Sequence, residues 1–163
     1  MELLIKKTCN PLKVRTLNLF VASVFLYNSE LWGMSKTTSD RIDSFHRRLL
    51  RYTLNMKWPK QVSNDRIYEL TKCEKWSKTI KRRRLNFLGH VMRLNENTPV
   101  RIALREALNP AGKKRERAKF TWLKTIFEDL KLGGIELNLN RPESVLQGLT
   151  KYHRRFKTVG EYY

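Results

Sequence analysis

The 163-residue sequence has only two cysteines and three histidines, so it holds few of the side chains that build metal centres and disulfide scaffolds. Cys9 and Cys73 are too few for a disulfide framework. We expect free thiols in a reducing compartment, with one bridge in a secreted protein as the alternative. No Cys or His pair has the spacing of a zinc site. We therefore expect neither a metal nor a cofactor.

Long apolar runs are also missing. The most apolar stretch, residues 17–32, is interrupted by polar side chains and falls short of the ~18 to 20 apolar residues that a membrane span needs. The first residues become charged before any long apolar segment, which argues against a signal peptide. These absences predict an intracellular protein, cytoplasmic or nuclear or both, that is not embedded in a membrane.

Acidic residues are scarce beside basic ones. There are 15 Asp and Glu against 34 Lys and Arg, which gives a formal net charge of +19. An excess of this size favours a polyanionic partner, most often nucleic acid, with anionic membrane and acidic protein as the alternatives. The sequence has neither an acidic cluster suited to two-metal nucleotidyl transfer nor a glycine-rich phosphate loop. We therefore expect no independent enzymatic activity.

Glycine and proline are rare, at seven and five residues, and most segments have helical periodicity. The pattern predicts an all-α protein, an irregular bundle of about five to seven helices. We expect helices near residues 11–32, 39–58, 64–70, 71–94, 100–107 and 120–130. Gly133 and Gly134 would separate a main helical unit, residues 1–133, from a tail, residues 134–163, with one candidate helix after Pro142.

The expected helices differ in character. The first is so apolar that we expect burial on more than one side, and residues 20–27 keep a strand as the alternative. The second would begin at Ser39, with Asp43 in its first turn. Its apolar face would comprise Ile42, Phe45, Leu49, Tyr52 and Met56. The third would begin at a capping box formed by Thr71 and Glu74. Its apolar face would comprise Trp76, Ile80, Phe87, Val91 and Leu94.

Three segments are strongly basic and are candidates for contact with phosphates. Their candidate residues are Arg47, Arg48 and Arg51; Lys75, Lys78, Arg82, Arg83 and Arg93; and Lys113, Lys114, Arg115, Arg117 and Lys119. Such side chains bind nucleic acid by neutralising phosphates and releasing counterions, without reading sequence. The alternatives are a solvated charged face or a nuclear localisation patch. Only Glu74 opposes the second segment.

Four basic residues of the second segment are predicted to lie on one helix face. By helical projection Lys75, Lys78, Arg82 and Arg93 share this face. Gly89 lies among them and would permit close approach of either a phosphate or a partner helix. Arg84 projects toward the apolar side instead, where we expect it to extend to solvent or to pair with an acid such as Glu69 or Glu30.

Aromatic and histidine side chains give weaker signals. Trp58 lies beside a proline and between lysines in a predicted turn, and it is the best candidate for base stacking. The other three tryptophans, Trp32, Trp76 and Trp122, lie at helix ends or in apolar stripes, where core packing is expected. His46 and His90 are expected to be hydrogen-bonded structural groups rather than catalysts.

Five segments of the sequence, taken in order, resemble five segments of one protein family. They read FLYNSELW (25–32), FHRRLLR (45–51), WPKQVSN (58–64), RRLNFLGHVMR (83–93) and GKKRERAKFTW (112–122). They resemble the L-Y-G-x-E-x-W, F-x-R-R-x-L-R, W-P-x-x-x-S-N, R-R-L-x-x-L-G-H-x-x-R and G-x-R-x-R-G-R-P-x-x-T-W segments of one family. That family is the reverse transcriptases encoded by non-LTR (LINE-type) retrotransposons, in their C-terminal region. The resemblance covers about residues 13–131.

The resemblance implies thumb and post-thumb elements that hold a template–primer, with residues 1–133 as the thumb-like unit. The family's catalytic Y-x-D-D motif is absent, so polymerase activity is not implied, and the missing palm domain becomes a candidate partner. Asn28 stands in place of a family glycine. Glu116, Arg117 and Ala118 replace a G-R-P core, which argues against minor-groove insertion there. The alternatives are a stand-alone basic nucleic-acid-binding module and a basic protein that binds acidic partners.

Overall fold

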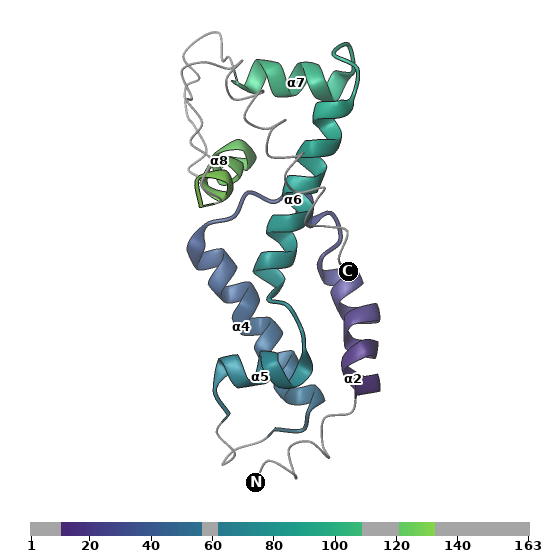
Figure 1. Ribbon diagram of the computed structural model, residues 1–163, viewed down its shortest axis with the longest axis vertical. Helices are drawn as coiled ribbons and strands as arrows, with labels where there is room; N and C mark the ends of the chain where they lie inside the picture. The colour runs from purple at the N-terminus through teal and green to yellow at the C-terminus, as the bar shows by residue number, and fades with distance from the viewer. Residues whose placement is uncertain (1–10, 57–61, 109–120, 133–163) are drawn as a thin grey trace. The chain divides into compact units, whose positions relative to one another are not determined.

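The computed structural model describes residues 11–56, 62–108 and 121–132 (Figure 1). Within these ranges 79% of the residues are helical and none is in a strand, which confirms the all-α prediction. The strand alternative for residues 20–27 is wrong. The elements are α2 (Pro11–Thr16), the π-helix η1 (Leu17–Ala22), α3 (Ser23–Phe25), the 3₁₀-helix η2 (Ser29–Leu31), α4 (Lys36–Thr53), α5 (Asn64–Thr71), α6 (Trp76–Arg93), α7 (Pro99–Leu108) and α8 (Trp122–Leu132).

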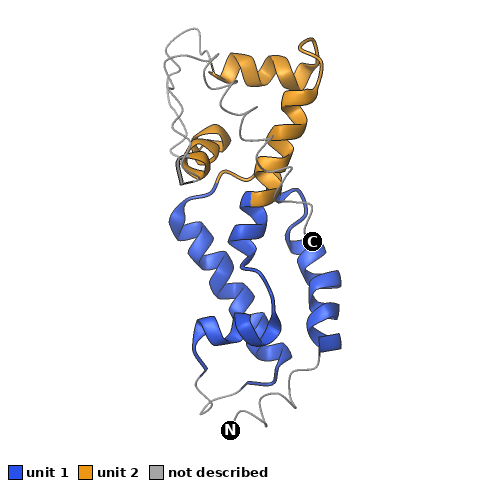
Figure 2. Ribbon diagram, viewed as in Figure 1, with its two compact units in different colours: residues 1–29, 34–81 blue, residues 30–33, 82–163 orange. Residues whose placement is uncertain are grey.

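The chain divides into two compact units (Figure 2). Unit 1 comprises Met1–Ser29 and Met34–Lys81, and unit 2 comprises Glu30–Gly33 and Arg82–Tyr163. This division falls inside α6, a position that the sequence pattern does not indicate. The boundary expected at Gly133 and Gly134, and the helix expected after Pro142, lie outside the described residues.

Unit 1 is built around apolar side chains from three different elements. Leu17 of η1, Leu50 of α4 and Ile67 of α5 form a buried cluster. Trp76 at the start of α6 is 3% exposed and stacks on Phe25, with ring centroids 4.8 Å apart. Burying these aliphatic and aromatic surfaces is the main favourable contribution to the stability of the unit.

Unit 2 packs the part of α6 that begins at Arg82, together with α7 and α8, around a second cluster. Its buried residues are Leu85, Leu88, Val91, Leu104, Ile126 and Leu130. Phe87, Trp122 and Phe127 are among the half-buried side chains around it. The apolar face predicted for the helix near residues 71–94 is found largely where the periodicity placed it, with Trp76, Ile80 and Val91 buried.

The segment from α2 to α3 begins at Pro11, as predicted, but the expectation that it is buried on several sides is wrong. Val14, Leu17 and Leu26 are buried. The exposed large apolar residues of the segment are Leu12, Leu19, Phe20, Val21, Val24 and Tyr27. The segment therefore packs along one side and leaves an apolar surface uncovered.

Helix α4 begins earlier than the sequence suggests. Ser35 is its N-cap, and the Ser35 side chain accepts a hydrogen bond from the backbone N–H of Thr38 at 3.2 Å. The buried face carries Ile42, Asp43, His46 and Leu50. Tyr52, predicted to face inward, lies about 180° from Asp43 at about 100° per residue and is 85% exposed. The core takes a stripe of α4 that includes two polar residues, which hydropathy alone does not select.

The start of α6 is also set by tertiary structure. Thr71 ends α5, and its hydroxyl donates to the Ile67 carbonyl, so the predicted capping box at Thr71 and Glu74 is wrong. Asp43 of α4 takes this role instead. Its two carboxylate oxygens accept hydrogen bonds from the Ser77 backbone N–H at 2.9 Å and from the Ser77 hydroxyl at 2.6 Å. A carboxylate at a helix N-terminus satisfies a free N–H and favours the helix dipole.

Candidate nucleic-acid interface

The three arginines predicted to bind nucleic acid on α4 have different surroundings. Arg48 is exposed, whereas Arg47 and Arg51 are half-buried. Arg51 Nη2 donates to the Val62 carbonyl at 3.3 Å and to Asn64 Oδ1 at 2.8 Å. Both acceptors are neutral, so these hydrogen bonds fix the guanidinium without cancelling its charge.

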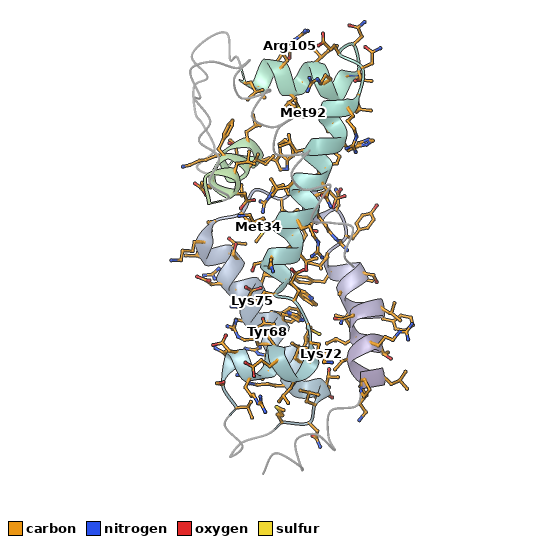
Figure 3. All side chains as sticks on the ribbon, in the orientation of Figure 1. Met34, Tyr68, Lys72, Lys75, Met92 and Arg105 are labelled. Atoms are coloured by element: carbon orange, nitrogen blue, oxygen red, sulfur yellow. The ribbon has the colours of Figure 1, made fainter. Side chains whose placement is uncertain are left out.

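The five basic residues predicted to contact phosphates in and just before α6 are exposed. Lys75 Nζ lies 5.8 Å from the centre of the Tyr68 ring, a cation–π distance, and the two residues are neighbours in Figure 3. Lys78 forms an ion pair with Glu74 at 3.3 Å, which places the one opposing acid of this segment next to it. Arg82, Arg83 and Arg93 are also exposed. Exposed ion pairs of this kind contribute little stability and are readily exchanged for a phosphate.

Several predicted residues lie elsewhere than expected or outside the described ranges. Gly89 is buried, so of its two suggested roles the helix-packing one fits its position. Trp58, Lys113, Lys114, Arg115, Arg117 and Lys119 lie outside the described residues.

One arginine of the basic run in α6 is buried and bound within the fold. Arg84 is 2% exposed, and its partner Asp129 is 9% exposed. Arg84 Nε lies 3.1 Å from Asp129 Oδ2, and Arg84 Nη1 donates to the Trp32 carbonyl at 2.9 Å. Burial lowers the pKa of Arg84, and the Asp129 charge opposes that shift. Arg84 thus pairs with Asp129 rather than with the suggested Glu69 or Glu30, and its position gives it a structural role.

Three of the segments that carry the family resemblance meet within unit 2. Besides the bond from Arg84 to Trp32, Trp122 Nε1 donates to the Glu30 carbonyl at 2.7 Å. Residues from three of these segments, Glu30 and Trp32, Arg84, and Trp122, are therefore joined by two hydrogen bonds within unit 2. The backbone at Asn28 is left-handed, with φ of 55°, a conformation that glycine and asparagine tolerate best. The replacement of the family's glycine by Asn28 is compatible with this backbone.

His46 is structural but not in the predicted way. It is fully buried, neither ring nitrogen has a hydrogen-bond partner among the described residues, and its ring stacks on Trp76 at 4.3 Å with 9° between planes. Burial lowers the pKa of His46 from 6.5 to about 4, while Asp43 raises it and Arg47 lowers it further. The ring is therefore neutral at pH 7. His90 is exposed.

The described residues were also compared with the requirements of metal sites, disulfide bonds and membrane-spanning helices. They contain no group of three or more His, Cys, Asp or Glu side chains placed to hold a metal ion. Cys73 is a free thiol, and Cys9 lies outside the described part. Among the described helices, none has both the length and the apolar character required to cross a bilayer.

Sequence reasoning does not identify two groups, one inside the fold and one on this surface. The pairing of Asp129 with Arg84 cannot be read from the sequence, because the two residues are far apart along the chain. Tyr52 is predicted to face the core but is exposed, and its place next to Arg48 and Arg51 in a basic helix is the signal that could have indicated this.

Comparison with protein-family models, curated proteins and solved structures finds no match to this chain.

Proposed function

We propose that these residues form a template–primer-binding C-terminal region of a retrotransposon-type reverse transcriptase, outside its catalytic palm. In this proposal basic helix faces hold the phosphate backbone of RNA, DNA or their hybrid. The chain positions nucleic acid and performs no chemistry of its own.

The observation that carries the proposal is the distribution of charge. Of the eight predicted phosphate-binding residues that are described, six are exposed and two are half-buried. The buried charged residues within the described ranges are Asp43, Arg84 and Asp129, two acids and one base. Burial thus removes more negative than positive charge from the surface. Exposed guanidinium and ammonium groups at this density favour a polyanion.

Two further features support the reverse-transcriptase form of the proposal. Three of the five segments that carry the resemblance contribute residues to two hydrogen bonds in unit 2, from Arg84 to the Trp32 carbonyl and from Trp122 to the Glu30 carbonyl. The apolar surface between α2 and α3, with Phe20 and Val24 at 69% and 77% exposed, is suited to packing against another domain. A thumb that normally rests on a palm would have such a surface.

A salt titration of binding tests the proposal. The purified chain is titrated with an RNA–DNA hybrid, duplex DNA and single-stranded RNA of equal length at several salt concentrations. If about six phosphates are bound, log K falls with log salt at a slope of about −5. We expect that slope and the tightest binding to the hybrid.

Other outcomes separate the alternatives. A steep slope without preference for the hybrid, in a protein that is soluble and monomeric alone, would favour a stand-alone nucleic-acid-binding module. A shallow slope with no discrimination among the three would contradict nucleic-acid binding and point to an acidic protein partner.

A further inference from the structure

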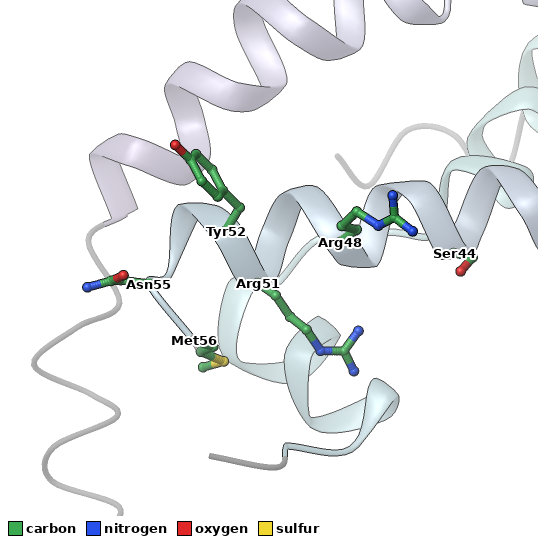
Figure 4. A pocket seen from close by; sticks show the side chains of 6 residues that line it. All are labelled: Ser44, Arg48, Arg51, Tyr52, Asn55 and Met56. Carbon is green, nitrogen blue, oxygen red and sulfur yellow. The ribbon is translucent and has the colours of Figure 1, made fainter. Parts of the chain in front are cut away.

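A shallow pocket of about 490 Å³ lies against the second half of α4, within unit 1 (Figure 4). It is lined by Ser44, Arg48, Arg51, Tyr52, Asn55 and Met56. The volume is in the range of small-ligand sites, roughly 300 to 1,000 Å³. None of the six lining residues is acidic, so a negatively charged group entering the pocket meets only cationic and neutral side chains.

The two guanidiniums of the pocket differ in how they are held. Arg48 is exposed, and Arg51 is tied to Val62 and Asn64 through two hydrogen bonds to neutral oxygens. A guanidinium has five N–H donors, so Arg51 keeps donors in addition to those two. An arginine whose guanidinium is already held in one orientation loses less side-chain conformational entropy when it binds a phosphate.

Tyr52 gives the pocket an aromatic wall. It is 85% exposed, and it follows Arg48 by one helical turn, so the two side chains rise from the same side of α4 (Figure 4). Arg51 leaves the helix from an adjoining side (Figure 4). At the end of the helix Asn55 adopts a left-handed conformation, with φ of 52°, and its amide offers both donors and an acceptor.

An exposed aromatic ring beside arginines is the combination that binds an unpaired nucleotide. The base stacks on the ring, and the guanidiniums bind the adjacent phosphates. In a duplex the bases are already stacked on one another and do not present a face to the ring. Phosphates are present in both forms, so the arginines alone do not discriminate between them.

We propose that this pocket binds one unpaired nucleotide of a single-stranded segment, with Tyr52 stacked on the base and Arg48 and Arg51 on the flanking phosphates. The inference rests on the proposed nucleic-acid binding and adds to it a site that selects single-stranded over paired nucleic acid. The chemistry that it recognises, a base face next to a phosphate, is common to RNA and DNA.

The test uses the full chain and a short oligonucleotide carrying one 2-aminopurine, prepared as RNA and as DNA, each single-stranded and fully paired. Stacking on Tyr52 should quench the fluorescence of the single strands on binding. Tyr52→Ala should abolish the quenching and weaken single-strand binding about tenfold or more, whereas duplex affinity should change less than about twofold. Tyr52→Phe, which keeps a ring, should behave like the parent.

Tyr27 provides a matched control, because it is also exposed, at 79%, and lies in unit 1 away from the pocket lining. Tyr27→Ala should leave both the quenching and the affinities unchanged. Arg48→Gln should weaken single-strand binding and make the salt slope shallower by about one.

Three results would overturn the inference. If Tyr52→Ala weakens the binding of single strands and of duplexes equally, the pocket is not the stacking site, although nucleic-acid binding itself stands. The same conclusion follows if Tyr27→Ala abolishes the quenching and weakens single-strand binding as much as Tyr52→Ala does. If the parent binds none of the oligonucleotides, the inference and the proposed function fail together. Circular dichroism of Tyr52→Ala verifies that the variant is folded, as expected for a residue this exposed.

Discussion

Arg84 of α6 and Asp129 of α8 form a buried ion pair, with Arg84 Nε 3.1 Å from Asp129 Oδ2. Arg84 is 2% and Asp129 9% exposed, and each directly precedes in sequence a residue of the buried core of unit 2, Leu85 and Leu130. Two charges in such a place require each other, because either one alone is left in an apolar environment without compensation. Arg84 also donates to the Trp32 carbonyl, which ties the segment Glu30–Gly33 into the same unit.

Removing one member of this pair is therefore expected to be costly. Asp129→Ala should lower the free energy of unfolding by about 3 kcal/mol or more, because it leaves the Arg84 guanidinium buried and unpaired. The double variant Arg84→Met/Asp129→Leu should be more stable than Asp129→Ala, since no charge remains buried. Urea unfolding followed by circular dichroism measures both. If Asp129→Ala unfolds like the parent, the pair does not stabilise the fold.

His46 should make the stability of unit 1 depend on pH. Its pKa is about 4 in the folded chain and ordinarily 6.5, so the unfolded chain binds more protons between those values. The contribution of neutral His46 to the free energy of unfolding is then fully present above about pH 6.5 and is lost as the pH falls toward 4. The size of the loss is on the order of 3 kcal/mol.

The variant His46→Phe tests this dependence, because a phenyl ring can stack on Trp76 and does not titrate. It should flatten the stability profile between pH 6.5 and 4 and stay within about 1.5 kcal/mol of the parent at pH 7. Denaturant unfolding at several pH values measures the profile. A variant that keeps the parent's slope would assign the acid sensitivity to other groups.

Asp43 should stabilise the start of α6 through its two hydrogen bonds with Ser77. Asp43→Ala removes both acceptors and should lower the free energy of unfolding by about 2 kcal/mol, the range of a strong N-cap plus a buried hydrogen bond. Asp43→Asn keeps one carbonyl oxygen and should cost less. An equal decrease in the two variants would show that the negative charge rather than the hydrogen bonds matters. Thermal unfolding of both measures the difference.

The exposed cations near α6 should contribute to nucleic-acid affinity through their charge. Replacing Lys75, Lys78, Arg82 and Arg93 together with Glu should weaken binding to all sequences alike and reduce the salt slope by about one for each phosphate that is no longer bound. A control variant with the same change in net charge replaces Lys13, Arg15, Lys36 and Arg105, which are also exposed. Equally weakened binding in the two variants would mean that overall charge, not this set of residues, drives binding.

The exposed apolar surface of the segment from α2 to α3, which includes Phe20 and Val24, should limit the solubility of the isolated chain. The double variant Phe20→Gln/Val24→Gln should reduce self-association in light scattering and change the free energy of unfolding by less than about 0.5 kcal/mol, because both side chains are exposed. Leu17→Gln in the same segment is the contrasting variant, since Leu17 is buried and its replacement should destabilise unit 1. A double variant that aggregates like the parent would locate the cause elsewhere.

The sequence predicted well those features that depend on local pattern. Helical periodicity placed α5 after Ser63 and the buried face of α6 on Trp76, Ile80 and Val91. It failed for α4, where the buried stripe includes Asp43 and His46. Hydropathy rejects both residues, but in the fold the Asp43 carboxylate accepts hydrogen bonds from Ser77 and the His46 ring stacks on Trp76.

By itself, then, the sequence determined an all-helical fold and an excess of positive charge, because periodicity and net charge can be read from the order and composition of the residues. Tertiary structure decided which charges serve the fold and which face the solvent. Arg84 lies in the same basic run as Arg82 and Arg83, yet it is buried because Asp129 and the Trp32 carbonyl lie within reach. Tyr52 shares α4 with His46 but faces outward, because one side of a helix is covered by its neighbours and the other is left to the solvent.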